Sequence, residues 1–245
     1  MITINPLYDA WINVDVQGAF LPGGGLGVPG ADSIIPVIRK NVVPLFPDKR
    51  GRFATCDMHE DGSVSLSTTY VDVPPNTLLT LGMVESWTDK NLAVGAKFNL
   101  ARLRAYLRIK SDHVQMAWNR HGVDPSDRKF PSELPESLFG YIQGKGHTDP
   151  VCDSYSGFRD PIGRPTGLTS VLRKNKFQRL FLTGLLKNYC VGLTGLDGVA
   201  DGFKVYIIDD GTYELDEPAG SVSQMNDKFR DADIRIITSD MMEAA

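Results

Sequence analysis

The sequence lacks the features of a secreted, disulfide-stabilised protein and of a membrane protein. Its 245 residues include only three cysteines, an odd and sparse set that indicates no disulfide framework and favours a reducing compartment. No apolar run approaches the roughly 18 residues that a membrane-spanning helix needs. The N-terminus shows no basic segment followed by an apolar one, as a secretory signal would. We therefore expect a cytoplasmic protein with no membrane partner.

An excess of basic residues is absent as well. Lys and Arg together number 26 against 30 Asp and Glu, which gives a net charge of -4 and no basic surface for nucleic acid. With 42% hydrophobic residues, the chain has enough apolar material for a full core. Its length allows one large α/β domain or two small ones.

Short apolar segments alternate with segments of helical spacing along most of the chain. Strands are expected at 10–16, 52–56, 137–143, 179–186, 204–208 and 234–238, and helices at 34–43, 100–109, 168–174 and 191–199. This alternation predicts an α/β fold in three layers, in which a mostly parallel six-stranded sheet lies between helices. Ligands of such sheets bind beyond the carboxyl ends of the strands, so functional residues are expected directly after strands.

Residues 70–113 fit this alternation poorly. The segment contains Pro74-Pro75 and then the amphipathic stretch from Leu100 to Ile109. We interpret it as an insertion at about 70–113 within a single domain that spans residues 1–245, because the segment is short and offers few candidate core residues. A lid over a pocket, an interface element and simple decoration all remain open as its role.

Cys190 follows the strand predicted at 179–186, at the turn into the next helix. At a helix N-terminus the dipole and the free amides stabilise a thiolate, and the same amides can receive an oxyanion. A buried structural residue is the commoner fate of a lone cysteine. The position at a strand-to-helix turn favours a nucleophile.

Two charged residues stand at the ends of other predicted strands. Asp15 ends the first strand, where an unpaired buried carboxylate would cost several kcal/mol. It is either a residue that caps a loop or a general base with a raised pKa. Lys145 follows the 137–143 strand between two glycines, where a lysine is commonly just solvated. Because it is expected at the same sheet edge, it is a candidate charge partner for Asp15 and Cys190.

A fourth group of residues has the chemistry of a metal site. Asp57 and His59 follow the 52–56 strand, and this pair suits a transition metal held on a loop. A third ligand is required, and the remaining candidates are His113 and His121. Without such a partner the Asp-x-His pair would be structural.

Two motifs connect these residues to a known family. Residues 145–158 read KGHTDPVCDSYSGF, and residues 184–191 read GLLKNYCV. Together with residues 9–20, 52–59 and 118–121, they resemble the nicotinamidase branch of the isochorismatase-like cysteine hydrolases. The resemblance extends over nearly everything from 138 to 210, and it implies an isochorismatase-like, Rossmann-like fold.

The resemblance also implies a role for each matching position. Asp15, Lys145 and Cys190 would form a catalytic triad, and the oxyanion hole would be the backbone amides of Leu186 and Cys190, next to a cis peptide bond between Leu185 and Leu186. The metal ligands would be Asp57, His59 and His121, around one divalent ion, with zinc expected and iron or manganese as alternatives. The substrate pocket would be walled by Phe20, Trp118, Leu185 and Leu186.

The implied activity is hydrolysis of nicotinamide to nicotinate and ammonia through a thioester, a step of NAD salvage. Pyrazinamide is the expected analogue, and relatives with this fold often form homo-oligomers. The metal ligands are the reason to expect nicotinamide as the substrate. Isochorismatase-like and carbamoyl-amide relatives share the triad but as a rule lack these ligands. Two alternatives stay open at this point: a related amidase that acts on another small amide, and a non-catalytic protein of the same fold that binds a small aromatic ligand.

Overall fold

The computed structural model describes residues 1–245 and is built on one central sheet. Its six strands lie in the order β6-β3-β2-β7-β8-β9, and every pairing is parallel, which confirms the predicted sheet. Their bounds are β2 Asp9–Val14, β3 Arg52–Asp57, β6 Tyr141–Lys145, β7 Arg179–Leu185, β8 Lys204–Tyr213 and β9 Arg235–Ile237.

Two of these strands differ from their predicted bounds by more than two residues at one end. β6 begins at Tyr141 instead of residue 137, because residues 136–138 form a 3-10 turn ahead of it. β8 extends beyond residue 208 to Tyr213, because its register against β7 shifts and resumes with Gly184 opposite Thr212.

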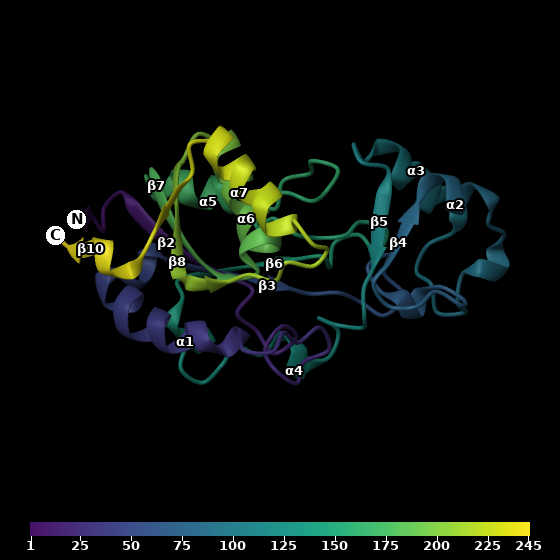
Figure 1. Cartoon of the computed structure of the whole chain (residues 1–245), viewed down its shortest axis with the longest axis horizontal. Helices are drawn as coiled ribbons and strands as arrows, with labels where there is room; N and C mark the ends of the chain where they lie inside the picture. Colours follow the sequence, from purple (N-terminus) through teal and green to yellow (C-terminus); the bar gives the residue numbers. More distant parts are fainter.

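Helices cover both faces of the sheet, as the three-layer prediction requires (Figure 1). On one face α1 (Ile34–Val37) continues into a helical stretch at Ile38–Val42. On the other face lie α5 (Leu168–Lys174), α6 (Gly192–Ala200) and α7 (Ser221–Asp231). No helix is long and apolar enough to cross a membrane.

Side chains of each central strand alternate between the two hydrophobic cores. In β2, Trp11 packs with α1 in one core, and its neighbour Ile12 packs with α5 and α6 in the other. Phe181 and Leu182 of β7 divide in the same way. Because the central strands are buried on both faces, their sequences are mostly apolar, and this explains why they were visible in the sequence.

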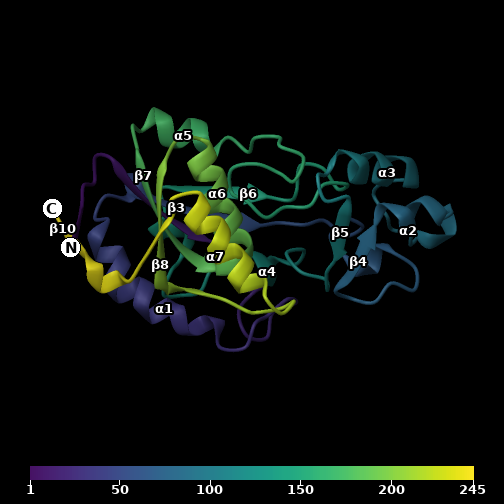
Figure 2. The same ribbon diagram turned by 45° about the horizontal axis from the view of Figure 1, so that its top comes forward.

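The insertion forms a small subdomain at the end of the molecule away from the two termini (Figures 1 and 2). It extends past the predicted boundary at 113 and contains an antiparallel pair of strands and two helices: β4 Thr77–Thr80, β5 Val114–Ala117, α2 Leu81–Ser86 and α3 Leu100–Ile109. Nine of the twelve residues of a buried hydrophobic cluster come from residues 70–117, among them Leu79, Leu103 and Leu107. The sequence therefore offered more core candidates here than we expected.

Three short elements complete the fold. β1 (Ile2–Ile4) and β10 (Met242–Ala244) pair in parallel and bring the two ends of the chain together. The one-turn helix α4 (Pro125–Arg128) follows the insertion.

The carboxyl ends of four neighbouring strands carry the candidate catalytic and metal-binding residues. Asp57 ends β3 and Lys145 ends β6, and the two residues are direct partners across the sheet. Asp15 directly follows β2, and Cys190 follows β7 after a short loop. The parallel register thus brings together residues that are far apart in the sequence.

Gly184 sets the distance between β2 and β7 just below this edge. Its φ is 120°, and a Cβ atom there would lie 2.0 Å from the Val14 carbonyl oxygen. We expect Gly184→Ala to lower the free energy of unfolding by about 3 kcal/mol or more, because left-handed strain adds to a backbone clash. Chemical denaturation measures this difference.

Gly163→Ala is the matched control for the clash. Gly163 has a φ of 88°, but nothing lies within 4 Å of an added Cβ atom. This variant should lose only about 1 kcal/mol, the cost of the conformation alone. Equal losses in the two variants would contradict a close approach of β2 and β7 at Gly184.

Candidate active site

Lys145 is the centre of a buried cluster of charged groups. Its Nζ lies 2.9 Å from Asp15 Oδ2, 3.3 Å from Asp57 Oδ1 and 3.7 Å from Cys190 Sγ. The residue is only 3% exposed. The lysine is therefore not solvated, and its ammonium contacts both Asp15 and Cys190, the partners that the sequence suggested.

Asp15 is held by the backbone and by one hydroxyl. Its φ of 50° lies in the left-handed region, which Asp tolerates better than most residues, and there the chain leaves the strand. The Thr55 hydroxyl donates a hydrogen bond of 2.6 Å to Asp15 Oδ1. Burial raises the pKa of Asp15 above its ordinary value, although Lys145 opposes this shift.

Cys190 is a thiol in this environment. Burial raises the pKa of the Cys190 thiol well above its ordinary value, and the positive charge of Lys145 offsets this only in part. This direction opposes the stabilisation of a thiolate that a helix N-terminus would provide. Its main cause is the burial of Cys190, which is only 9% exposed.

Lys145 remains an ammonium despite its burial. Desolvation alone would lower the pKa of Lys145, but Asp15 and Asp57 outweigh it and hold the pKa well above its ordinary value. A thiol, a carboxyl group of raised pKa and a fixed ammonium thus lie within contact distance of one another.

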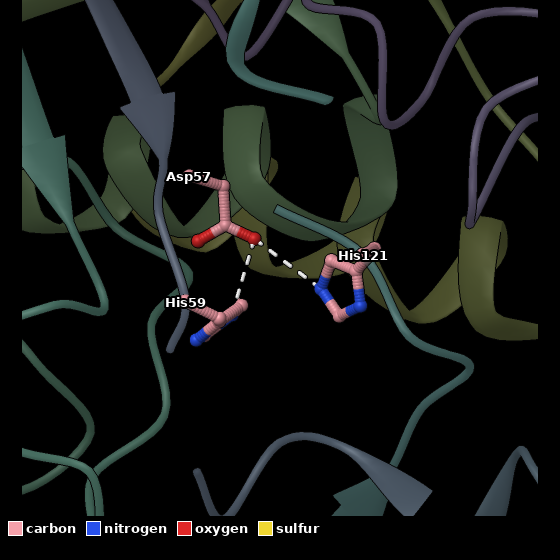
Figure 3. Close-up of side chains that lie close together, drawn as sticks. All are labelled: Asp57, His59 and His121. Carbon is pink, nitrogen blue, oxygen red and sulfur yellow. Dashed lines mark ion pairs between the residues drawn. The ribbon is translucent and has the colours of Figure 1, made fainter. Parts of the chain in front are cut away.

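The second cluster joins Asp57 and His59, at and just after the end of β3, to His121 in the loop between β5 and α4 (Figure 3). Asp57 Oδ2 lies 3.3 Å from His59 Nε2 and 3.4 Å from His121 Nε2. The candidate ligand atoms of the three residues all lie within 4.8 Å of one another, and all three residues are buried. Of the two candidates for a third ligand, His121 belongs to this group, whereas His113 contacts the Leu107 carbonyl oxygen at 2.9 Å.

The donor set fits a divalent metal. His59 has both ring nitrogens buried without a hydrogen-bond partner, which is costly unless a ligand satisfies one of them. The Nδ1 atom of His121 contacts the Asn119 carbonyl oxygen at 2.7 Å, so Nε2 is the atom that faces Asp57. Burial would raise the pKa of Asp57, but His59 and Lys145 outweigh it and keep the pKa of this carboxyl well below its ordinary value. Two imidazoles and a carboxylate suit zinc, iron or manganese.

Gln17 and Asp153 support these clusters, and we did not predict either role. The Gln17 side chain accepts a hydrogen bond of 2.7 Å from the Asp57 amide and donates one of 2.9 Å to the Asp57 carbonyl oxygen. Asp153 Oδ1 lies 3.8 Å from His59 Nε2. Its carboxylate accepts hydrogen bonds from Ser65, from Ser154 and, at 2.6 Å, from Gln115 of the insertion.

A pocket of about 1090 Å³ opens above both clusters. All four predicted wall residues line it, namely Phe20, Trp118, Leu185 and Leu186, together with Cys190, Asp57 and His121. The peptide bond between Leu185 and Leu186 is cis, as expected. Tyr189 and Tyr155 also line the pocket, and both contact Trp118. Both tyrosines belong to motifs noted in the sequence, Ser-Tyr-Ser and Tyr-Cys. The motifs alone could not show that the two rings face the pocket.

Comparison with known proteins agrees with this geometry. The isochorismatase domain family matches residues 153–240. A nicotinamidase of Schizosaccharomyces pombe is 33% identical over 168 residues, which cover 68% of this chain and 71% of the relative.

Two solved structures share the whole fold. A nicotinamidase and pyrazinamidase of Acinetobacter baumanii superposes with a TM-score of 0.78 at 26% identity, and the match covers 97% of this chain and 99% of that one. The pyrazinamidase of Pyrococcus horikoshii, solved in complex with zinc, superposes with a TM-score of 0.64 at 26% identity, covering 94% of this chain and 98% of that one.

A parallel α/β sheet with a buried thiol, carboxyl group and ammonium at its carboxyl edge defines a cysteine hydrolase of the isochorismatase type. Within that class, the chain belongs to the nicotinamidase family.

We expect Asp153→Asn to weaken binding of a divalent metal by about 10- to 100-fold, the usual effect of removing an outer partner of a metal-binding histidine. The physical reason is the loss of a buried negative charge that faces His59. Competition between metal-stripped protein and a chromophoric chelator for Zn²⁺ measures the affinity without any assay of activity.

Glu85→Gln is the control for removing an acidic residue from this part of the molecule. Glu85 lies in the insertion and pairs with Arg108 at the surface. Its affinity for Zn²⁺ should equal that of the parent protein. An unchanged affinity in Asp153→Asn, with circular dichroism showing an intact fold, would contradict the role assigned to Asp153.

Proposed function

We propose that this protein hydrolyses nicotinamide to nicotinate and ammonia, with Cys190 as nucleophile, and so contributes to NAD salvage. The observation that carries the proposal is the buried contact of Lys145 Nζ with Asp15 at 2.9 Å and with Cys190 Sγ at 3.7 Å, at the floor of the pocket. Membership of the nicotinamidase family supports nicotinamide as the substrate. The names of two solved relatives support pyrazinamide as an analogue.

Attack begins with transfer of a proton from the Cys190 thiol to Asp15. A thiol with a raised pKa does not ionise unaided, so a base beside it is required. The raised pKa of Asp15 makes this carboxylate a stronger base than one in water. Lys145 remains positive throughout and stabilises whichever of the two groups carries the negative charge.

The sulfur then attacks the carboxamide carbon. Negative charge moves onto the amide oxygen, which the backbone amides of Leu186 and Cys190 would stabilise as an oxyanion hole. Asp15 returns its proton to the nitrogen as the C–N bond breaks, so ammonia leaves and a thioester remains. Asp15, again a carboxylate, takes a proton from the water that attacks the thioester carbon and gives it to the sulfur as the C–S bond breaks. The thiol is regenerated, and nicotinic acid leaves and ionises to nicotinate.

The aromatic ring would lie between Phe20 and Trp118, which both line the pocket. Asp57, His59 and His121 would hold the divalent metal, for which we propose zinc, as in the Pyrococcus horikoshii structure. When bound, the metal would supply Lewis-acid chemistry to the pocket that Asp57 and His121 line. Gln17 would hold Asp57 in position, and Asp153 would hold His59.

Replacing the nucleophile tests this function. We expect Cys190→Ala to lower the rate of ammonia release from nicotinamide by about a thousand-fold or more, because no thioester can form. A coupled assay for ammonia measures the rate, and pyrazinamide is assayed in parallel.

Cys152→Ala is the control, since Cys152 is a buried cysteine after β6 that packs in the same hydrophobic cluster as Leu79 and Leu107. It should retain the parent rate. Normal turnover by a folded Cys190→Ala protein would refute the nucleophile. Binding of nicotinamide to the parent protein without release of ammonia would instead indicate a non-catalytic binding protein.

A further inference from the structure

The pocket is larger than a single small aromatic amide requires. Its volume of about 1090 Å³ reaches the upper end of the range, roughly 300–1,000 Å³, that accommodates drug-sized ligands. The residues at its floor are buried, with Cys190 at 9% and His121 at 2% exposed, whereas Leu78 at its mouth is 47% exposed. A nicotinamide molecule at the floor would therefore leave the outer part of the pocket unfilled.

The insertion supplies one wall of this outer part. Leu78 of β4 and Met116 of β5 are direct partners across the hairpin, and both line the pocket. Their neighbours Leu79 and Ala117 point to the opposite side and are fully buried in the hydrophobic cluster of the insertion. The hairpin thus turns one apolar face to its own core and a second apolar face to the pocket.

The opposite wall comes from the segment that follows β8, where Leu215 and Pro218 line the pocket. No Lys or Arg lines any part of the pocket, and its carboxyl groups are those of Asp57, Asp153 and Glu217. A ligand that enters the outer part therefore meets apolar side chains and negative charge. A neutral, apolar group fits this lining, and an anionic group does not.

The geometry points to a second binding subsite, in which Leu78 and Met116 contact an apolar substituent on the ring of an aromatic carboxamide whose amide reacts at Cys190. This inference rests on the function proposed above. It extends the substrate class from nicotinamide to aromatic carboxamides with a neutral, apolar ring substituent. Such a substituent belongs on ring carbon 5 or 6, because these carbons do not flank the carboxamide and so point away from Cys190.

Nicotinamides that carry a phenyl group at carbon 5 or at carbon 6 test the subsite. At least one of them should be hydrolysed by the metal-loaded parent protein with a kcat/KM within about tenfold of that for nicotinamide. Hydrolysis of nicotinamide alone, with neither phenyl compound hydrolysed, would overturn the subsite and leave the proposed function standing. Hydrolysis of none of the three would overturn both.

Variants of nearly equal size identify the wall. Leu78→Asn and Met116→Gln should each reduce kcat/KM for the phenyl compound relative to nicotinamide by about tenfold, because the apolar contact is lost. Val94→Thr is the control: Val94 is an exposed apolar residue of the same insertion that does not line the pocket. It should leave both rates unchanged. An unchanged ratio in Leu78→Asn and Met116→Gln would overturn the assignment of this wall.

Discussion

A single buried ammonium, that of Lys145, is shared between two carboxyl groups that belong to different parts of the chemistry. Asp15 lies 2.9 Å away beside Cys190, the proposed nucleophile, and Asp57 lies 3.3 Å away in the cluster that we propose holds the metal. Removing three such charges from water costs several kcal/mol for each ion, and only close pairing offsets this cost. The positive charge of the ammonium offsets the repulsion between the two nearby carboxyl groups. The cluster around Cys190 and the cluster of metal ligands therefore depend on the same residue.

The parallel sheet fixes the backbone at these residues, so that little further conformational entropy is lost when the side chains are ordered. Each group is attached at or near the carboxyl end of a strand, where hydrogen bonds to the neighbouring strands fix the backbone. Asp57 and Lys145 are register partners, and Gln17 binds the backbone of Asp57 from the loop after β2. The side chains are therefore ordered before any substrate arrives, which is the condition for efficient positioning and electrostatic stabilisation.

Much of this arrangement was visible in the sequence because buried parallel strands are mostly apolar. A charged residue at the end of such a strand stands out, and that signal located Asp15, Asp57 and Lys145 at one edge; Cys190 was located by its place in the turn from a strand to a helix. The hairpin β4–β5 was missed for a physical reason. Leu78 faces the pocket and Leu79 faces the hydrophobic cluster, so the strand has no alternation of polar and apolar residues to detect.

Asp153 was missed as a functional residue because its partners Ser65 and Gln115 are distant in the sequence. The state of Cys190 depends on the depth of its burial, which no local pattern encodes.

The central claim is that Cys190 carries the acyl group during turnover. Rapid acid quenching of the protein during hydrolysis of nicotinamide, followed by mass spectrometry of its peptides, tests this claim most directly. A nicotinoyl group should be found on the peptide that contains Cys190, and it should disappear when the substrate is exhausted. A nicotinoyl group on the peptide of Cys56 or Cys152, or hydrolysis with Cys190 already blocked by an alkylating reagent, would contradict it.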